Sequence, residues 1–215
     1  MADEWYQYVS EDHFWYQWRF HVIRRMLRTI ELGERILEVG CGSGVARDQL
    51  EACYGRPVLG CDLNVPAMER ARPGRGKLYA YDVHDRRPQW EASFDTVFLL
   101  DTLEHIDDPV GFLQSVRFHV AEHGLVIVNV PALQSMYSVY DEVAGHTKRY
   151  RLTVLRDELR SAGFNVVKHS YWGLLLLPVL AVRKWVMRFT DRDHVITRGF
   201  QPPSKWADWL LRTLM

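Results

Sequence analysis

The sequence lacks an excess of charge of either sign. Its 215 residues include 27 basic and 27 acidic side chains, so the formal net charge at pH 7 is zero. Proteins that bind nucleic acid over a broad surface usually carry a basic patch or domain. We therefore expect no nucleic-acid partner, and a few local side chains would have to bind any charged ligand.

Paired cysteines and metal-binding spacings are also missing. Cys41, Cys53 and Cys61 are an odd number of cysteines without a CxxC pair, which suits a reducing compartment better than a disulfide framework or a zinc site. The N-terminal sequence MADEWYQYVSEDHFW is acidic and aromatic, whereas a secretory signal is basic and then aliphatic. We expect a cytoplasmic protein that binds no metal.

No apolar run is long enough to cross a bilayer. The longest, Tyr171 to Val182, has Pro178 near its centre and about 12 residues, against roughly 20 for a spanning helix. No internal repeat or low-complexity tract is visible. The length and the 47% hydrophobic content predict a single domain with one sizeable core.

Short apolar runs, each followed by a turn signal and a segment of helical length, predict five strands. They are Arg35–Val39, Pro57–Cys61, Lys77–Tyr81, Phe94–Leu100 and Leu125–Val130. Strands that alternate with helices predict an α/β fold with a doubly wound, mostly parallel, Rossmann-like sheet. Asp108 before Pro109 predicts one helix start, and Thr153 and Gly163 predict the start and end of another.

A glycine-rich loop follows the first predicted strand. Gly40, Gly42 and Gly44 lack side chains where backbone must approach a ligand, and the loop opens a helix. Their spacing is GxGxG, with Val45 where the dinucleotide fingerprint GxGxxG has its third glycine, which disfavours NAD. Glu38 would repel a pyrophosphate but suits a cationic group such as an ammonium or sulfonium.

Acidic residues follow the next strands, at the sheet edge where such folds bind ligands. Asp62 takes the position at which a nucleotide fold presents a carboxylate to ribose hydroxyls, although it would serve equally as a helix cap. Asp82 can accept a hydrogen bond from an adenine amine, while Leu63 and Val83 offer apolar faces to the ring. Together these residues predict a nucleoside pocket.

The motifs ILEVGCGSG, CDLN, YDV, LLDTLEHIDDP and GHTKRYRLTVLRDELRSAGF resemble those of the class I S-adenosylmethionine-dependent methyltransferases. Over about residues 10 to 180, the sequence is most similar to the small-molecule and lipid branch related to ubiquinone-biosynthesis enzymes. The resemblance implies a helical cap over 1–32, a cofactor-binding core over 33–131, and an acceptor-side segment with amphipathic helices over 132–215.

The resemblance also implies that the cofactor is S-adenosyl-L-methionine. The glycine-rich loop would approach its methionine part, Glu38 would orient its amino group, Asp62 would bind the ribose, and Asp82 with Val83 would meet the adenine. The complete predicted cofactor-binding set is Glu38, Gly40, Cys41, Gly42, Gly44, Asp62, Leu63, Asp82, Val83 and Asp101.

Methyl transfer needs an aligned acceptor, and a base where the acceptor must lose a proton. His146, in the segment where the resembling family builds its acceptor site, and His105, after the fourth strand, are the candidate catalytic residues. His105 also fits a structural role, hydrogen-bonded to loop backbone. The candidate substrate-binding residues are Tyr137, Tyr140, Arg149 and Tyr150. They fit aromatic contacts and binding of a carboxylate or phosphate, with packing and a solvated basic turn as the alternatives.

Both flanks carry apolar faces. Residues 10–30, with Ser10 as a cap, predict an amphipathic helix that closes over the cofactor or packs on the sheet edge. Residues 171–215 combine aliphatic, aromatic and basic side chains, which suits peripheral membrane contact, a homodimer or ordinary core. Relatives add a final antiparallel strand beside the fifth, for which only HVITRGF at 194–200 is a substitute.

We therefore predict a methyltransferase that acts on a small-molecule or lipid-like acceptor, most readily at oxygen. A cofactor-binding scaffold without catalysis, which would contact a partner or a membrane, is the alternative. An NAD-dependent oxidoreductase is a distant third because of the glycine spacing.

Overall fold

The computed structural model describes residues 12–187, 189 and 195. Ser10 and all of 196–215 lie outside the described residues, so the predicted cap and the end of the C-terminal amphipathic segment are not placed. The N-terminal helix α1 (Phe14–Met26) begins with the His13 side chain accepting a hydrogen bond from the Trp15 N–H. It ends four residues before the predicted limit of Ile30.

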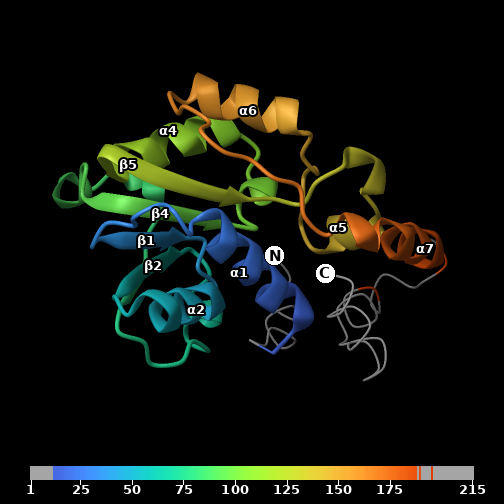
Figure 1. Cartoon of the computed structure of the whole chain (residues 1–215), viewed down its shortest axis with the longest axis horizontal. Coiled ribbons are helices and arrows are strands. Elements are labelled where there is room, and N and C mark those ends of the chain that lie inside the picture. The colour runs from blue at the N-terminus through green and yellow to red at the C-terminus, as the bar shows by residue number, and fades with distance from the viewer. Residues whose placement is uncertain (1–11, 188, 190–194, 196–215) are drawn as a thin grey trace.

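Five parallel strands form one sheet in the order β3-β2-β1-β4-β5. They are β1 (Ile36–Val39), β2 (Val58–Asp62), β3 (Leu78–Ala80), β4 (Phe94–Leu100) and β5 (Val120–Asn129). The predicted α/β fold is confirmed, and the strand order reverses between β1 and β4 (Figure 1). Ligands of such sheets bind at the carboxyl ends of the strands beside this reversal.

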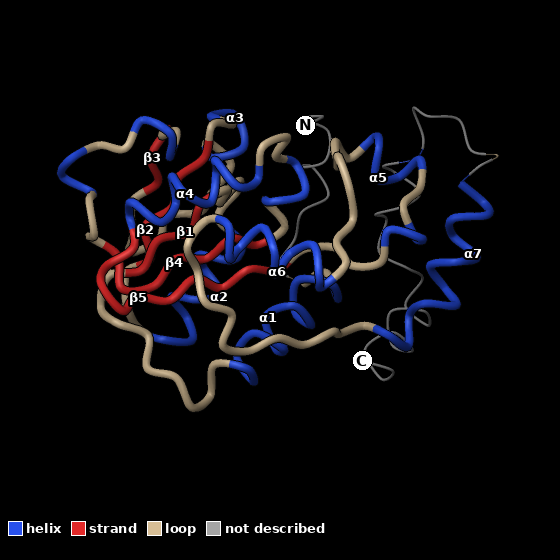
Figure 2. The backbone as a smooth tube through the Cα atoms, turned by 90° about the horizontal axis from the view of Figure 1, so that it is seen from above, coloured by secondary structure: helices blue, strands red, loops and turns tan. Residues whose placement is uncertain are grey.

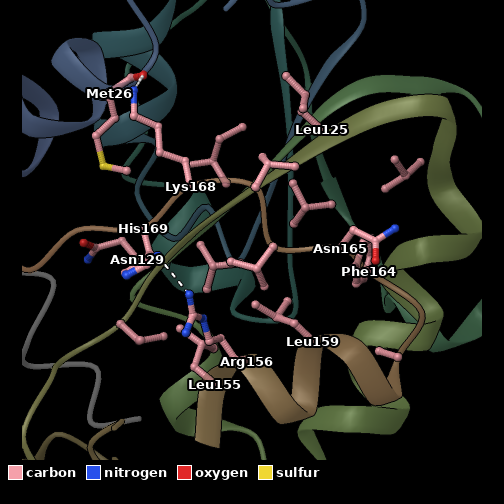
Figure 3. Close-up of a pocket in the computed structure, with 18 of the residues that line it drawn as sticks. Met26, Leu125, Asn129, Leu155, Arg156, Leu159, Phe164, Asn165, Lys168 and His169 are labelled. Atoms are coloured by element: carbon pink, nitrogen blue, oxygen red, sulfur yellow. Dashed lines mark hydrogen bonds between the residues drawn. The ribbon is translucent and has the colours of Figure 1, made fainter. Parts of the chain in front are cut away.

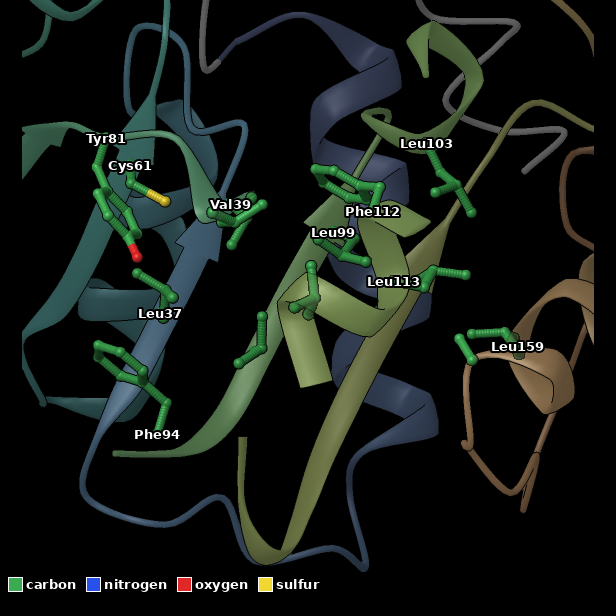
Figure 4. Close-up of a cluster of buried hydrophobic side chains, with 14 of the residues drawn as sticks. Leu37, Val39, Cys61, Tyr81, Phe94, Leu99, Leu103, Phe112, Leu113 and Leu159 are labelled. Carbon is green, nitrogen blue, oxygen red and sulfur yellow. The ribbon is translucent and has the colours of Figure 1, made fainter. Parts of the chain in front are cut away.

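Helices cover both faces of the sheet. Helix α1 and helix α2 (Val45–Tyr54) pack on one face, and α4 (Pro109–His119) and α6 (Leu152–Ser161) on the other (Figure 1). Alternate residues of β4 serve the two cores: Val97 and Leu99 belong to the cluster with α4 and α6, Phe98 to the one with α1 and α2. Figure 4 shows the first cluster around Leu99 and Phe112. Two buried faces require the continuous apolar strands that the sequence contains.

Three further α-helices lie outside the two covering layers. Helix α3 (Val65–Met68) follows β2, α5 (Val139–Val143) follows β5, and α7 (Leu177–Met187) follows α6 through a long connection. Figure 2 shows α5 and α7 together beyond the end of the sheet, where the strands have their carboxyl ends. These two helices therefore form a wall opposite the loops that follow β1, β2 and β4.

The predicted helix boundaries are confirmed at three of four points. Asp108 accepts a hydrogen bond from the Gly111 N–H and Pro109 begins α4. Gly163 follows the end of α6 with a φ of +87°. Thr153 is wrong as the cap of α6, because the helix begins at Leu152 after an extended Arg151. Thr153 was favoured by its hydroxyl, yet the side chain of the observed N-cap makes no capping hydrogen bond.

The described residues contain no sixth strand. Beside the free edge of β5 lies a cavity of about 1110 Å³, bounded by β5, α6 and the extended segment 163–172 (Figure 3). Val195, the described residue of HVITRGF, is helical and packs with Tyr16, Tyr140 and Met187. Residue 195 thus does not extend the sheet, and the rest of that heptapeptide lies outside the described residues.

Candidate active site

A cavity of about 740 Å³ opens at the carboxyl ends of β1, β2 and β4. The loops that follow these strands line one side of it, and α1, α5 and α7 line the other. Most of the predicted site residues border this cavity: Glu38, Gly40, Cys41, Gly42, Asp62, Leu63, Asp82, Val83, Asp101, His105, Tyr140, His146 and Arg149. Gly44, Tyr137 and Tyr150 do not border it.

The glycine-rich loop has the conformation that its composition predicts. Gly40, Gly42 and Gly44 have φ values of +76°, +49° and +75°, which disfavour side chains. A Cβ on Gly40 would lie 2.5 Å from Oγ1 of Thr102. Burial raises the pKa of the Cys41 thiol, so this cysteine stays a neutral, small side chain rather than a thiolate nucleophile.

Glu38 is an acid in the protein interior. Its side chain is 2% exposed, and Oε2 has no hydrogen-bond partner among the described residues. Burial raises the pKa of Glu38 to about 8, although the guanidinium of Arg19 and the backbone N–H of Arg47 act against the shift. A buried carboxylate with an unsatisfied oxygen fits a cationic ligand group, such as the amino group of the cofactor.

Asp101 is engaged by other protein groups. Arg19 of α1 donates to its Oδ2 at 2.8 Å, and the Asn129 side chain donates to its Oδ1. Asp101 also has a φ of +56°, unusual for a residue with a side chain. Arg19 is 4% exposed and borders the cavity. Helix α1 is therefore joined to the cofactor side of the site.

The two acids predicted to meet the nucleoside take part in local turns. Oδ2 of Asp62 accepts from the Gly42 N–H and Oδ1 from the Asn64 N–H, both at 2.7 Å. Asp82 accepts from the His84 N–H at 2.9 Å. These bonds orient both carboxylates beside the cavity, and carboxylate oxygens have further lone pairs for ligand hydroxyls or amines.

The side chains predicted to flank the ring differ in exposure. Leu63 is 69% exposed and Val83 is buried, yet both border the cavity. Leu63 thus offers a solvent-facing apolar surface, whereas Val83 presents one side of the hydrophobic core.

His105 and His146 lie side by side on the acceptor side, with ring centroids 4.8 Å apart. Nδ1 of His105 bonds the Gly145 carbonyl at 3.0 Å. Burial, and then His146, lower the pKa of His105 to about 4, so its imidazole is neutral at pH 7. The predicted bond from His105 to loop backbone is therefore present, and the ring still borders the cavity.

Asp141 anchors His146. The buried Oδ1 of Asp141 bonds Nδ1 of His146 at 3.0 Å and accepts from Nε of Arg149 at 2.7 Å. These two bonds hold the pKa of Asp141 at about 2 against the opposing effect of burial. Asp141 is a site residue that the sequence analysis missed. An acid five residues before a candidate catalytic histidine was the available signal, and Asp141 lies in α5 while His146 follows that helix.

Glu104 is the second missed residue. It precedes His105, is fully buried, and burial followed by the nearby Asp101 raises its pKa. Glu104, His105 and His146 each offer one ligand atom, and these atoms lie within 4.8 Å of one another. The described chain can thus bring metal-binding groups together, although no spacing in the sequence predicts it.

Of the four predicted substrate-binding residues, two line the cavity. Tyr140 is buried under Arg183 of α7, whose guanidinium carbon lies 4.2 Å from the ring centroid, and Arg149 is bonded to Asp141. Tyr150 is core, 2% exposed, with its hydroxyl directed to the Leu103 carbonyl. The Tyr137 hydroxyl donates to the His146 carbonyl at 2.8 Å and supports that loop instead.

Comparisons with known proteins identify the family of this chain. A family of methyltransferase domains matches residues 11–169. A ubiquinone biosynthesis O-methyltransferase from Paracidovorax citrulli is 34% identical over 176 residues, which cover 79% of this chain and 67% of that protein. A probable S-adenosylmethionine-dependent methyltransferase from Mycolicibacterium smegmatis is 28% identical over 162 residues, covering 74% of this chain and 62% of that protein.

Solved structures share the fold. A SAM-dependent methyltransferase from Archaeoglobus fulgidus superposes with a TM-score of 0.54 at 18% identity, covering 80% of this chain and 86% of that one. The fold and the site together define a class I S-adenosylmethionine-dependent methyltransferase. The chain belongs to the methyltransferase domain family, and its cofactor is S-adenosyl-L-methionine.

Proposed function

We propose that this enzyme methylates a hydroxyl oxygen of a small, partly apolar or lipid-like acceptor. The observation that carries the proposal is the two-sided cavity, in which the paired imidazoles of His105 and His146 stand next to the apolar wall of α7. Leu177 and Leu180 of α7, with Leu176 in the turn directly before it, belong to that wall. An apolar surface with a few polar groups is typical of pockets for small organic ligands.

Different residues of this chain would bind the cofactor and the acceptor. S-adenosyl-L-methionine supplies the electrophilic methyl group. Glu38, Asp62 and Asp82 would hold the charged and hydroxylated parts of the cofactor, while the aliphatic side chains of α7 exclude water from the acceptor. The acceptor oxygen would lie against His105 and His146, where it loses its proton. Alignment of the acceptor with the methyl group is the main contribution of the protein.

We further propose that helix α7 and the turn before it contact a membrane surface from the cytoplasmic side. Large apolar side chains are exposed there, including Trp185, which is 62% exposed, and Val182. Lys184 lies between them in the sequence; its ammonium donates to the Ser135 carbonyl at 2.6 Å and has further N–H groups for anionic headgroups. No helix in the described part of the chain is both long and apolar enough to span a bilayer. A homodimer through the same face is the alternative.

His146→Ala tests the acceptor assignment. Removing an imidazole at the acceptor should lower turnover by about 10²–10⁴-fold, while the dissociation constant for S-adenosylhomocysteine, measured by calorimetry, stays the same. His123→Ala, at an exposed position of β5, is the matched control and should change neither quantity. Equal losses of turnover and cofactor affinity in His146→Ala would remove His146 from the acceptor site.

A further inference from the structure

Glu104 is a fully buried acid that borders the cavity. Its side chain is 0% exposed, and neither carboxyl oxygen has a hydrogen-bond partner among the described residues. Burying a polar group is unfavourable unless another group satisfies it. Since Glu104 borders the cavity, a ligand in the cavity can provide the missing partner.

In both histidines beside Glu104, Nδ1 is bonded to the protein and Nε2 is left for a ligand. Nδ1 of His105 faces the Gly145 carbonyl, and Nδ1 of His146 faces the Asp141 carboxylate. A carbonyl and an ionised carboxylate can only accept, so the neutral form of each ring carries its proton on Nδ1 and has its lone pair on Nε2. Metal-binding histidines in proteins typically have their second nitrogen bonded in this way.

The loops that carry these groups are held together by backbone bonds. The Thr147 N–H donates to the Glu104 carbonyl at 2.8 Å, and the Thr147 hydroxyl donates to the same oxygen at 3.0 Å. The turn after β4 and the loop after α5 are thereby joined next to the ligand groups. A site held by such bonds needs little reorganisation when a ligand arrives.

We propose that Glu104, His105 and His146 form a binding site for a divalent transition-metal cation. Their ligand atoms lie within 4.8 Å of one another, so small side-chain rotations bring them to the ~2.0–2.2 Å metal–ligand distances of such sites. Two imidazoles and one carboxylate suit Zn²⁺, Co²⁺, Mn²⁺ or Fe²⁺ better than Mg²⁺ or Ca²⁺, which prefer oxygen ligands. Three protein ligands leave coordination positions open.

The open positions give the cation a function that rests on the proposed acceptor site. An acceptor hydroxyl that binds the cation becomes more acidic, as metal-bound water does. Its O–H bond breaks, the proton passes to water while the hydroxyl binds and before α7 covers the acceptor, and the oxygen keeps the electron pair as a metal-bound alkoxide or phenoxide. In this arrangement the imidazoles of His105 and His146 are metal ligands and the cation acidifies the acceptor.

Cobalt binding tests the site directly. The protein, freed of tightly bound metal by a chelator, is titrated with Co²⁺ and followed by visible absorption, which reports ligand field and stoichiometry without any turnover. We expect one Co²⁺ per chain, displaced by Zn²⁺. Glu104→Gln, His105→Gln and His146→Gln should each weaken binding by about 10–100-fold or more, whereas His123→Gln should bind like the unchanged protein.

The affinity for S-adenosylhomocysteine separates the possible failures. Variants that keep this affinity are folded, so unchanged Co²⁺ affinity in all three would overturn the site. Absence of one-to-one Co²⁺ binding in the unchanged protein would overturn it as well. Undiminished methyl transfer by chelated protein would refute the role of the cation and leave the proposed function standing. Metal binding without any methyl transfer would instead refute the proposed function and leave the metal site standing.

Discussion

Glu38 is a buried acid that we expect to be protonated in the free protein and ionised when the cofactor is bound. In the free protein its pKa of about 8 keeps most of the carboxyl protonated at pH 7. A bound ammonium group stabilises the carboxylate, so cofactor binding should release a proton. The other charged groups that influence it are Arg19 from α1, Arg47 from α2 and Asp62 from β2.

We therefore predict that S-adenosylhomocysteine binding at pH 7 releases up to about one proton. Calorimetry in two buffers of different ionisation enthalpy measures this number directly. In Glu38→Gln the buffer dependence should vanish and the affinity should fall, because the amide carries no charge. Binding enthalpies that are equal in both buffers for the unchanged protein would contradict the assignment of Glu38.

The same group has a predictable effect on stability. Its folded pKa is raised above the unfolded value, so the folded state holds the proton longer and the free energy of unfolding falls as pH rises from about 4.5 to 8. The slope contributed by Glu38 is at most about 1.4 kcal/mol per pH unit. In urea unfolding across this window, the free energy of unfolding of the unchanged protein should fall with rising pH relative to that of Glu38→Gln, whose amide does not titrate. A difference independent of pH would show that Glu38 ionises normally.

At this scale the sequence predicted the cavity-lining residues better for the loops after β1 and β2 than for the loops after β4 and β5. Glu38 lies one residue before the end of β1 and Asp62 ends β2, so their place at the carboxyl edge of the sheet depends only on local order. Glu104 and His146 meet because two loops 42 positions apart, from 104 to 146, pack together. That contact is tertiary, and no spacing in a single sequence reports it.

At the scale of elements, α1 is fixed to the sheet by a buried ion pair. Arg19 and Asp101 have side chains that are 5% and 26% exposed. Arg19→Met should lower the free energy of unfolding by about 1.5–3 kcal/mol, because the partly exposed Asp101 loses its charged donor and keeps only the bond from Asn129. Asp101→Asn in the same chain should restore part of the loss. Urea titrations of the two single variants and the double variant measure this coupling, and additive losses would show that the pair does not stabilise α1.

Helix α7 exposes apolar side chains, which we propose contact either a membrane or a second copy of the chain. Trp185→Glu should reduce co-sedimentation with vesicles that contain anionic lipid by at least ~10-fold, since it removes an apolar anchor and adds a repelled charge. Val167→Glu, at another exposed apolar position, is the matched control and should not change it. If the unchanged protein ignores vesicles and instead sediments as a dimer that Trp185→Glu dissociates, the face of α7 joins two copies.

Element prediction succeeded where patterns are local. All five strands were found because a sheet covered on both faces requires continuous apolar runs. Thr153 was misplaced because a good capping residue one position inside a helix looks like a cap in the sequence. Tyr150 was expected to bind substrate, but its ring lies in the core cluster with residues of β4 and α4, and its hydroxyl donates to the Leu103 carbonyl. The sequence around an aromatic residue with a polar tip does not show whether its side chain is buried.

At the scale of the whole molecule, one end of the sheet combines a cofactor side and an acceptor side. The parallel sheet, with the loops after its strands gathered at one edge, follows from the alternation of strands and helices in the sequence. The wall formed by α5 and α7 does not, because it depends on where the chain returns after α6 (Figure 2). Because this wall lines the acceptor side of the cavity, the sequence does not predict which acceptor binds there. A direct assay has to identify the acceptor.

The most direct test uses methyl-labelled S-adenosyl-L-methionine and an extract of the source cell, divided into organic and aqueous phases after reaction. We predict label in the organic phase, on a product whose methyl group resists mild base as an ether does. His146→Ala should yield little of that product. Absence of label in both phases, together with tight binding of S-adenosylhomocysteine, would contradict the account and indicate a cofactor-binding scaffold.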